Sequence, residues 1–134
     1  MAKTITQRIV FKNAKSETLY DMFLNSKIHA AITGGGAAKI SGKEGTIFSV
    51  YDGYITGKNL QLVKGKLIVQ SWLASDWGPG ESDSTFILLF EQKGKETIIN
   101  MTHANIPDAH VDGIRKGWTD FYWKPWKKYL LSRI

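Results

Sequence analysis

Residues 117–129 read GWTDFYWKPWKKY, a segment that holds six aromatic residues in thirteen positions. Apolar residues recur at spacings of three and four through this segment and back to Val111, a periodicity typical of one face of an amphipathic helix. The predicted inward positions are Val111, Ile114, Trp118, Phe121 with Tyr122, and Pro125. A helix with so wide an aromatic stripe must lie on another element, so the segment predicts a long C-terminal helix that packs on the rest of the fold.

Pro125 should disturb this helix. A proline deep in a helix removes one backbone hydrogen bond and clashes with the preceding turn, which here lies near Phe121. We therefore expect the helix to bend or to change register at this point, and either change lets it follow a curved sheet.

The chain before this helix alternates apolar and polar residues over short segments, as β-strands do. The expected strands cover residues 4–11, 46–51, 54–63, 66–72, 84–92 and 97–104. Gly53, Gly65 and Gly94 lie in short connections of hairpin-turn composition, whereas residues 74–83 form a longer connection. The strands from residue 46 onward are therefore predicted to form a consecutive antiparallel meander.

Two short helices are expected between the first strand and the meander. Ser16 and Ser26 are of the residue type that caps helix N-termini, so we expect each to cap one helix. The residues expected to face inward are Leu19, Met22 and Phe23 in the first helix and Ile28, Ala31 and Ile32 in the second. His29 is expected at the surface of the second helix, and the glycine run 34–36 should end it.

The length and composition fit one compact domain over residues 1–134. A chain of 134 residues with 43% hydrophobic content can bury roughly two thirds of its unfolded surface. The sequence has no Cys, which excludes disulfides, thiolate zinc sites and cysteine nucleophiles and agrees with a reducing compartment. It has no apolar run of signal-peptide or transmembrane length, so we expect a cytoplasmic protein that does not bind membranes.

The charge balance of 18 Lys and Arg against 12 Asp and Glu favours acidic partners. The basic residues cluster only on the polar side of the last helix, at Arg115, Lys116, Lys124, Lys127, Lys128 and Arg133. A solvated helix face is the ordinary interpretation of such a cluster. Beyond that, an acidic protein surface is the expected partner, and nucleic acid is not expected.

The sequence lacks a catalytic motif. Three dispersed His and no Cys predict neither a metal site nor a cofactor ligand set, and there is no Gly-x-Ser-x-Gly nucleophile motif. Asp108 follows Pro107 at the start of a helix, where an N-cap is more common than an acid–base pair with His110. We therefore expect no catalytic residues and no enzymatic activity.

Several blocks of the sequence resemble one family in order and spacing. They are DGYITGKNL at 52–60 with Leu62 and Val63, IVQSW at 68–72 followed by Trp77, Glu96-Thr97, Ile106-Pro107, and Gly117-Trp118 with Phe121 and Tyr122. From about residue 5 to 129 the chain resembles the domain family of the activator of the heat-shock-protein-90 ATPase, within the START-like helix-grip superfamily that includes birch-pollen-allergen-like and polyketide-cyclase-like proteins. The resemblance implies an α+β fold in which a curved antiparallel sheet of about six or seven strands wraps around the long C-terminal helix, with two short helices after the first strand.

The resemblance also implies an interior space between sheet and helix. Alternation along the strands indicates which side chains face this space. The candidate lining residues are Trp72, Phe86, Leu88, Phe90, Ile99, Met101, His103, Trp118, Phe121 and Tyr122. Two interpretations remain open: these residues form a packed core, or they surround a pocket for a flat or elongated apolar ligand, with Tyr122 and His103 as polar groups.

The family resemblance implies a non-enzymatic, stress-related, co-chaperone-like protein that contacts a heat-shock chaperone through its surface. Chaperone activators pair this domain with a separate N-terminal domain, whereas this sequence holds one domain, so we expect docking rather than full stimulation of the ATPase. The alternatives are a soluble binder or carrier of a small hydrophobic ligand and, third, a cyclase- or hydrolase-type enzyme. The sequence is compatible with a monomer or a homodimer.

Overall fold

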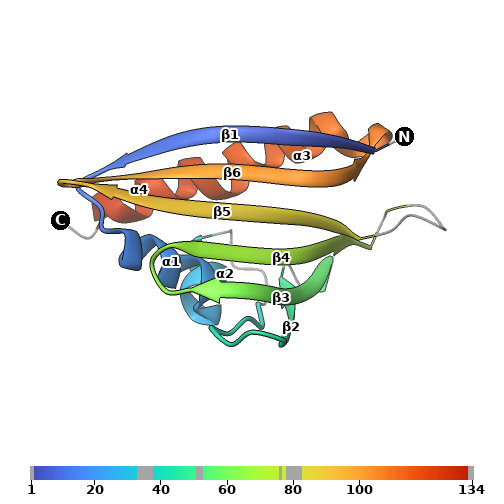
Figure 1. The fold of residues 1–134 in the computed structure, drawn as a ribbon, viewed down its shortest axis with the longest axis horizontal. Helices are drawn as coiled ribbons and strands as arrows, with labels where there is room; N and C mark the ends of the chain where they lie inside the picture. The colour runs from blue at the N-terminus through green and yellow to red at the C-terminus, as the bar shows by residue number, and fades with distance from the viewer. Residues whose placement is uncertain (1, 33–37, 51–52, 76, 78–82, 133–134) are drawn as a thin grey trace.

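The computed structural model describes residues 2–32, 38–50, 53–75, 77 and 83–132. Within these residues, six antiparallel strands form one sheet in the order β1-β6-β5-β4-β3-β2 (Figure 1). The strands are β1 (Ala2–Lys12), β2 (Ile47–Val50), β3 (Ile55–Val63), β4 (Leu67–Ala74), β5 (Ser84–Lys93) and β6 (Glu96–Pro107). The predicted meander is confirmed from β2 to β6. β1 pairs with β6 and forms the edge of the sheet opposite β2.

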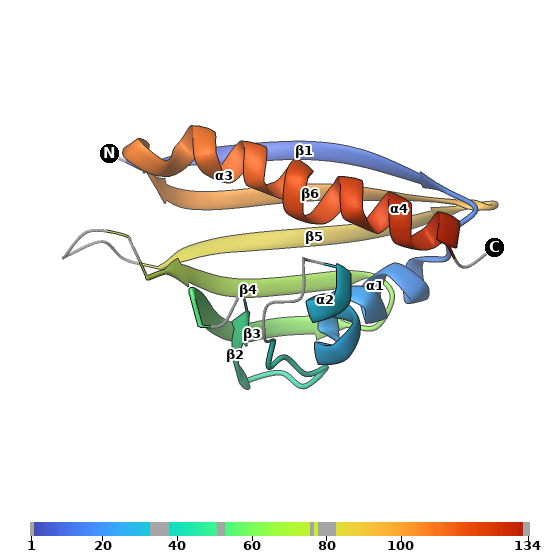
Figure 2. The ribbon, with the colours of Figure 1, turned by 180° about the vertical axis from the view of Figure 1, so that it is seen from behind.

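The helices cover one face of the curved sheet, which gives the predicted α+β helix-grip architecture (Figure 2). Two short helices follow β1, and a long C-terminal helix runs across the same face of the sheet, over β1, β6 and β5. These elements are α1 (Ser16–Leu24), α2 (Ser26–Ile32), the 3₁₀ turn η1 (Asp108–His110), α3 (Val111–Trp118), the π-helical turn η2 (Thr119–Trp123) and α4 (Lys124–Ser132). No helix within the described ranges is long and apolar enough to cross a membrane.

Strand alternation places the expected side chains between the sheet and the helices. Every second residue of β4 and of the first part of β5 is buried, as a period of two requires. The predicted inward set of β5 and β6 is confirmed, because Phe86, Leu88, Phe90, Ile99, Met101 and His103 are all buried.

The glycines of the hairpin turns have the positive φ angles typical of such turns. Gly65 and Gly94 adopt φ values of +71° and +59°, which only glycine and a few polar residues readily adopt. Gly53 also has a positive φ, of +86°, whereas Asp52 before it and the glycine run 34–36 lie outside the described residues.

The prediction that Ser16 caps the first helix is wrong. Ser16 is the first helical residue, and Lys15 occupies the cap position without a side-chain hydrogen bond. The backbone N–H of Ser16 instead donates to Oε1 of Gln92 at 2.8 Å. A side chain of β5 thus accepts a backbone N–H at the start of α1. Sequence spacing cannot reveal a partner so distant in the chain.

The prediction that Ser26 caps the second helix is also wrong. Oδ1 of Asn25 accepts the N–H of Ile28 at 3.0 Å and takes the capping role. The Ser26 hydroxyl instead bonds both backbone groups of Ile40, its oxygen accepting from the N–H at 2.7 Å and its proton going to the carbonyl at 2.8 Å. Ser26 therefore holds the segment before β2 against α2.

The inward face of the C-terminal helix differs from its prediction after Trp118. The N–H of Lys124 bonds the carbonyl of Thr119, five residues back, so the loop closed by this bond contains one more residue than the corresponding loop of an α-helix. This extra residue turns Trp123 and Trp126 inward and leaves Phe121 54% exposed. The predicted register change before Pro125 is confirmed, whereas the inward assignment of Phe121, which assumed an uninterrupted α-helix, is wrong.

Candidate functional site

An open pocket of about 410 Å³ lies between α3 and the strands β3 and β4. Its described lining residues are Tyr54, Ile55, Trp72, Trp77, Ala109, His110, Gly113, Ile114, Gly117, Trp118, Phe121 and Tyr122. Most of this wall is aromatic, and it contains no Lys, Arg, Asp or Glu among the residues that the structure describes. A mainly apolar pocket with a few polar groups is the usual form of a small-molecule site.

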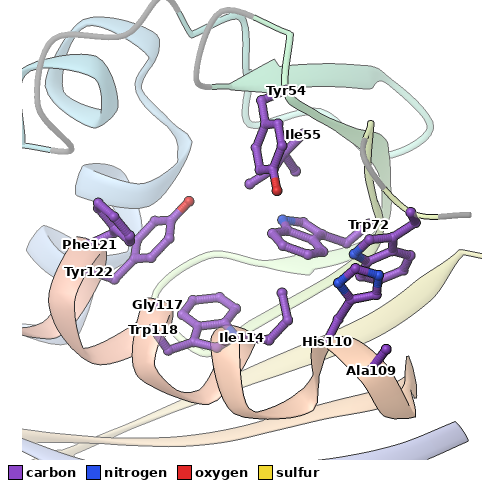
Figure 3. A pocket seen from close by; sticks show the side chains of 12 residues that line it. Tyr54, Ile55, Trp72, Ala109, His110, Ile114, Gly117, Trp118, Phe121 and Tyr122 are labelled. Atoms are coloured by element: carbon purple, nitrogen blue, oxygen red, sulfur yellow. The ribbon is translucent and has the colours of Figure 1, made fainter.

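The polar groups of the pocket come from opposite walls. Figure 3 shows the hydroxyl of Tyr54, which immediately precedes β3, and that of Tyr122, on η2, on opposite sides of the pocket. At the other end the His110 ring stacks on Trp77, with ring centroids 5.7 Å apart and planes inclined by 23°.

A chain of hydrogen bonds fixes the base of the pocket. The indole N–H of Trp118 donates to Nδ1 of His103 at 3.0 Å. Because an indole can only donate, Nδ1 carries no proton, and the neutral ring has its N–H at Nε2. Nε2 donates to the Ser84 hydroxyl at 2.7 Å, and this hydroxyl donates to the Trp72 carbonyl at 2.8 Å. The chain thus connects two tryptophans of the pocket wall through the buried side chains of β5 and β6.

His103 is a structural group at this site. Burial lowers its pKa from the ordinary 6.5 to about 3, so the imidazole is neutral at physiological pH. Both ring nitrogens are committed, one to Trp118 and the other to Ser84. The side chain lies behind the pocket wall and holds Trp118 in place.

His29 anchors the opposite wall, which makes the prediction of a surface position for this residue wrong. It is 2% exposed, because α2 lies against the C-terminal helix. Nδ1 donates to the carbonyl of Phe23 at 2.8 Å, so Nε2 accepts the proton of the Tyr122 hydroxyl, at 3.2 Å. Burial lowers the pKa of His29, and the bond to the Phe23 carbonyl only partly opposes this shift.

The ten candidate lining residues divide into two groups in the structure. Trp72, Trp118, Phe121 and Tyr122 line the pocket, and Phe121 does so from its rim. The other six are buried and are not among the described lining residues: Phe86, Leu88, Phe90, Ile99, Met101 and His103. Side chains therefore fill the space below the helix, and the open volume lies beside α3.

Sequence reasoning missed part of the pocket wall. Tyr54 lies within the block at 52–60 that carries the family resemblance, and Gly113 and Gly117 lie four residues apart, each directly before a position of the apolar stripe. Trp77 comes from the longer connection, where no periodicity exists to assign its direction. The two glycines were thus the available signal for an opening beside the helix.

The pocket holds no acid–base or metal constellation in the described part of the chain. No three His, Asp or Glu side chains there are grouped so that they could hold a metal ion. The described lining residues include no carboxylate, and His110 supplies the imidazole, the side chain most often used in general acid–base catalysis.

A second feature is a basic helix surface, formed by Lys124, Lys127 and Lys128 on the solvent side of α4. Lys124 forms an ion pair of 3.5 Å with Asp120, and Nζ of Lys127 lies 5.8 Å above the ring of Phe11. Two exposed apolar side chains flank the lysines, Phe121 at 54% and Leu131 at 70% exposure. Arg133, which the sequence places in the same cluster, lies outside the described residues.

The sheet, the two short helices and the long C-terminal helix define a START-like helix-grip protein. Ara h 8.0201 shares this fold at a TM-score of 0.79 and 12% identity, with 98% of this chain and 99% of the other covered. An HSP90 activator from Plasmodium falciparum has a crystal structure that matches at a TM-score of 0.85 and 25% identity, with 97% and 96% of the two chains covered.

The family model "Activator of Hsp90 ATPase homolog 1-like protein" matches residues 13–130, and the chain belongs to this family. The mouse activator of 90 kDa heat shock protein ATPase homolog 1 is 32% identical over 108 residues, which make up 81% of this chain. The Dictyostelium discoideum activator homologue is 31% identical over 116 residues, or 86% of this chain. The chain spans less than a third of the length of these relatives, 31% of the mouse protein and 28% of the Dictyostelium protein.

Proposed function

We propose that this chain is a non-enzymatic, co-chaperone-like module that docks on an acidic surface of a heat-shock chaperone of the Hsp90 type. The observation that carries the proposal is the basic helix surface of Lys124, Lys127 and Lys128. Membership of the Hsp90 activator family supports the choice of partner.

The composition of this surface suits a protein partner. The chain carries a net charge of +6, and clustered lysines attract an acidic patch and raise the rate of association. Phe121 and Leu131 add apolar area beside the lysines, and both are exposed. In protein interfaces apolar anchors supply much of the affinity, and charges at the rim steer and orient the association.

The proposal is limited to docking. Because the chain corresponds to 31% of the length of its mouse relative, stimulation of a chaperone ATPase is not part of it.

Titration calorimetry with purified full-length mouse Hsp90 tests this proposal. We expect the triple variant Lys124→Glu, Lys127→Glu, Lys128→Glu to bind at least about tenfold more weakly and with a smaller salt dependence. The matched control reverses three exposed lysines on or near the β2–β3 edge, at Lys39, Lys43 and Lys58. The control should bind like the parent. Equal weakening by both triples would show a non-specific effect of net charge and would contradict the proposed surface.

A second candidate function is the binding or transport of a small apolar molecule. The observation that favours it is the open aromatic pocket beside α3. A cyclase or hydrolase activity is not proposed, because among the described lining residues His110 is the one imidazole and no carboxylate accompanies it.

A further inference from the structure

We infer that two copies of this chain associate through the outer face of the sheet, about a two-fold axis that runs along the line between β4 and β5. Figure 1 views the molecule from this face, and the described helices lie behind the sheet. The inference is independent of chaperone docking through α4 and of small-molecule binding, because both of those sites lie on the helix side of the sheet.

The outer face of the central strands is aliphatic. Antiparallel sheets usually carry polar side chains on the face that no helix covers. Five aliphatic side chains form two neighbouring rows here, Val63–Leu67–Leu89 across three strands and Val69–Ile87 across two. Leu89 is 50% exposed and Val63 42%, and the other three are partly exposed. Aliphatic side chains gathered in one exposed patch are typical of an interaction site.

The two sides of the line between β4 and β5 match in chemical character. The outward cross-strand pairs along this line are Leu67–Leu89, Val69–Ile87 and Ser71–Thr85. A two-fold axis parallel to the strands keeps each residue at its level along the strand and places β5 of one copy over β4 of the other. Leucine then faces leucine, one β-branched aliphatic side chain faces another, and hydroxyl faces hydroxyl. A two-fold interface requires this self-complementarity, whereas a contact with a different protein does not.

The basic residues of these rows lie at the margins. Because the chain has a net charge of +6, two copies repel each other unless their contact surface keeps like charges apart. Lys58 lies on β3, paired with Ser71, and Arg8 lies on β1, at the edge of the sheet. The rotation places Lys58 opposite Ala104 of β6 and leaves Arg8 beyond β3 of the other copy. Neither cation therefore faces another cation of these rows.

One carboxylate adds an attraction between the copies. Glu91 lies two residues beyond Leu89, and its side chain is 54% exposed although it forms an ion pair of 3.2 Å with Lys93. The turn between β3 and β4 lies at the same level and carries Lys64 and Lys66. The rotation brings the carboxylate of each copy over this turn of the other, so opposite charges meet at both ends of the contact.

The contact is small, so the dimer is weak. Four strands spaced about 4.8 Å apart and three rows about 6.8 Å apart cover roughly 400 Å² on each copy. Stacked sheets keep their strand directions within about 30° of each other, and the curvature of the sheet confines the contact to the strands nearest the axis. Specific interfaces usually bury about 1,200 Å² or more in total, so we expect half of the chains to associate only at about 0.1–1 mM.

Sedimentation equilibrium of the purified chain between about 10 µM and 1 mM tests the association. The average mass of the parent should rise with concentration from that of one chain towards that of two. Leu89→Lys places a charge against leucine of the other copy and should weaken association at least about tenfold. Leu131→Lys, the same change at a 70% exposed position on α4, is the matched control and should associate like the parent. Because both positions are exposed, both variants should keep the thermal unfolding midpoint of the parent.

Chemical crosslinking locates the axis. The chain has no Cys, so Leu89→Cys carries a single thiol. With the axis parallel to the strands, the two copies of this position lie at the same level of facing sheets, and a short bismaleimide should link them. Leu131→Cys, on α4, is the control and should remain unlinked.

Each outcome supports or overturns the inference. A parent that keeps the mass of one chain at every concentration would overturn the dimer, and chaperone docking would stand. Association that survives in Leu89→Lys, or that weakens equally in Leu131→Lys, would overturn the outer face as the contact. A dimer in which Leu89→Cys stays unlinked would overturn the axis. If the parent is monomeric and Leu89→Lys binds full-length mouse Hsp90 at least about tenfold more weakly, the face belongs to the chaperone and not to a second copy.

Discussion

The indole N–H of Trp118 donates to Nδ1 of His103 at 3.0 Å, and both side chains are buried. This bond joins the C-terminal helix to β6 and fixes the tautomer of the imidazole. Because Trp118 also lines the pocket, the same bond makes one pocket wall part of the core. Stability and pocket shape are therefore coupled at this residue.

Trp118 should be one of the most sensitive positions for folding. Trp118→Ala removes a buried aromatic side chain and should lower the free energy of unfolding by about 3–5 kcal/mol. Trp118→Phe keeps most of the volume but leaves Nδ1 of His103 without its donor, so a smaller loss of about 1–3 kcal/mol is expected. Urea denaturation measures both values. A midpoint for Trp118→Ala that equals that of the parent would refute the packing of this helix face.

Stability should fall in mild acid because of the buried imidazoles. Burial lowers the pKa of His103 to about 3 in the folded chain, against an ordinary value of 6.5 in the unfolded chain. The unfolded chain therefore binds this proton first, and stability decreases as the pH falls from about 6.5 towards 3, by up to about 5 kcal/mol. Burial also lowers the pKa of His29, which adds a loss of the same sign.

The variant His103→Gln separates this effect from the titration of carboxylates. Its amide can accept from Trp118 and donate to Ser84 but does not titrate, so its stability should be lower at pH 7 and depend less on pH between 6.5 and 4 than that of the parent. Denaturation curves at several pH values supply the comparison. Parallel pH profiles for parent and variant would exclude His103 as a source of the acid sensitivity.

Met101 tests whether the space below the helix is filled. This side chain is 1% exposed and lies in the packed core rather than in the pocket wall. Met101→Trp should therefore cost about 1–3 kcal/mol through overpacking, as measured by denaturation. If the variant is as stable as the parent, there is spare volume beneath the helix, contrary to the packed core described above.

Gly57 is predicted to tolerate no side chain. A Cβ at this position would overlap the carbonyl oxygen of Ser71 and lie 2.8 Å from the ring of Phe48. Gly57→Ala should therefore destabilise the β3–β4 pairing by about 2 kcal/mol or more. Gly42→Ala is the control, because a Cβ there would meet nothing within 4 Å. Similar unfolding midpoints for the two variants would contradict the close approach of these strands.

The strands were predictable because their side-chain period is two. Phe86, Leu88, Ile99 and Met101 could be assigned to the interior by alternation alone. The alternation of side-chain direction continues along a strand unless a β-bulge adds a residue. In the C-terminal helix, the predicted side-chain directions depended on an uninterrupted α-helical period. One extra residue in η2 was enough to bring Trp123 inward in place of Phe121.

Other features depend on partners far away in the sequence. His29 is buried because its ring meets Tyr122, which lies 93 residues later. The capping of α1 by Gln92 likewise joins residues 76 positions apart. Local patterns contain no information about such pairs, and this is also why the sequence did not predict Tyr54 and Trp77 as part of the pocket.

The most direct test of the proposed docking is hydrogen–deuterium exchange of the chain, alone and in complex with full-length mouse Hsp90. The proposal predicts slower exchange in the complex over η2 and α4, residues 119–132, with little change over β2 and β3. Protection confined to residues 47–63, or a stable complex with no protection of α4, would contradict the basic helix surface as the docking site.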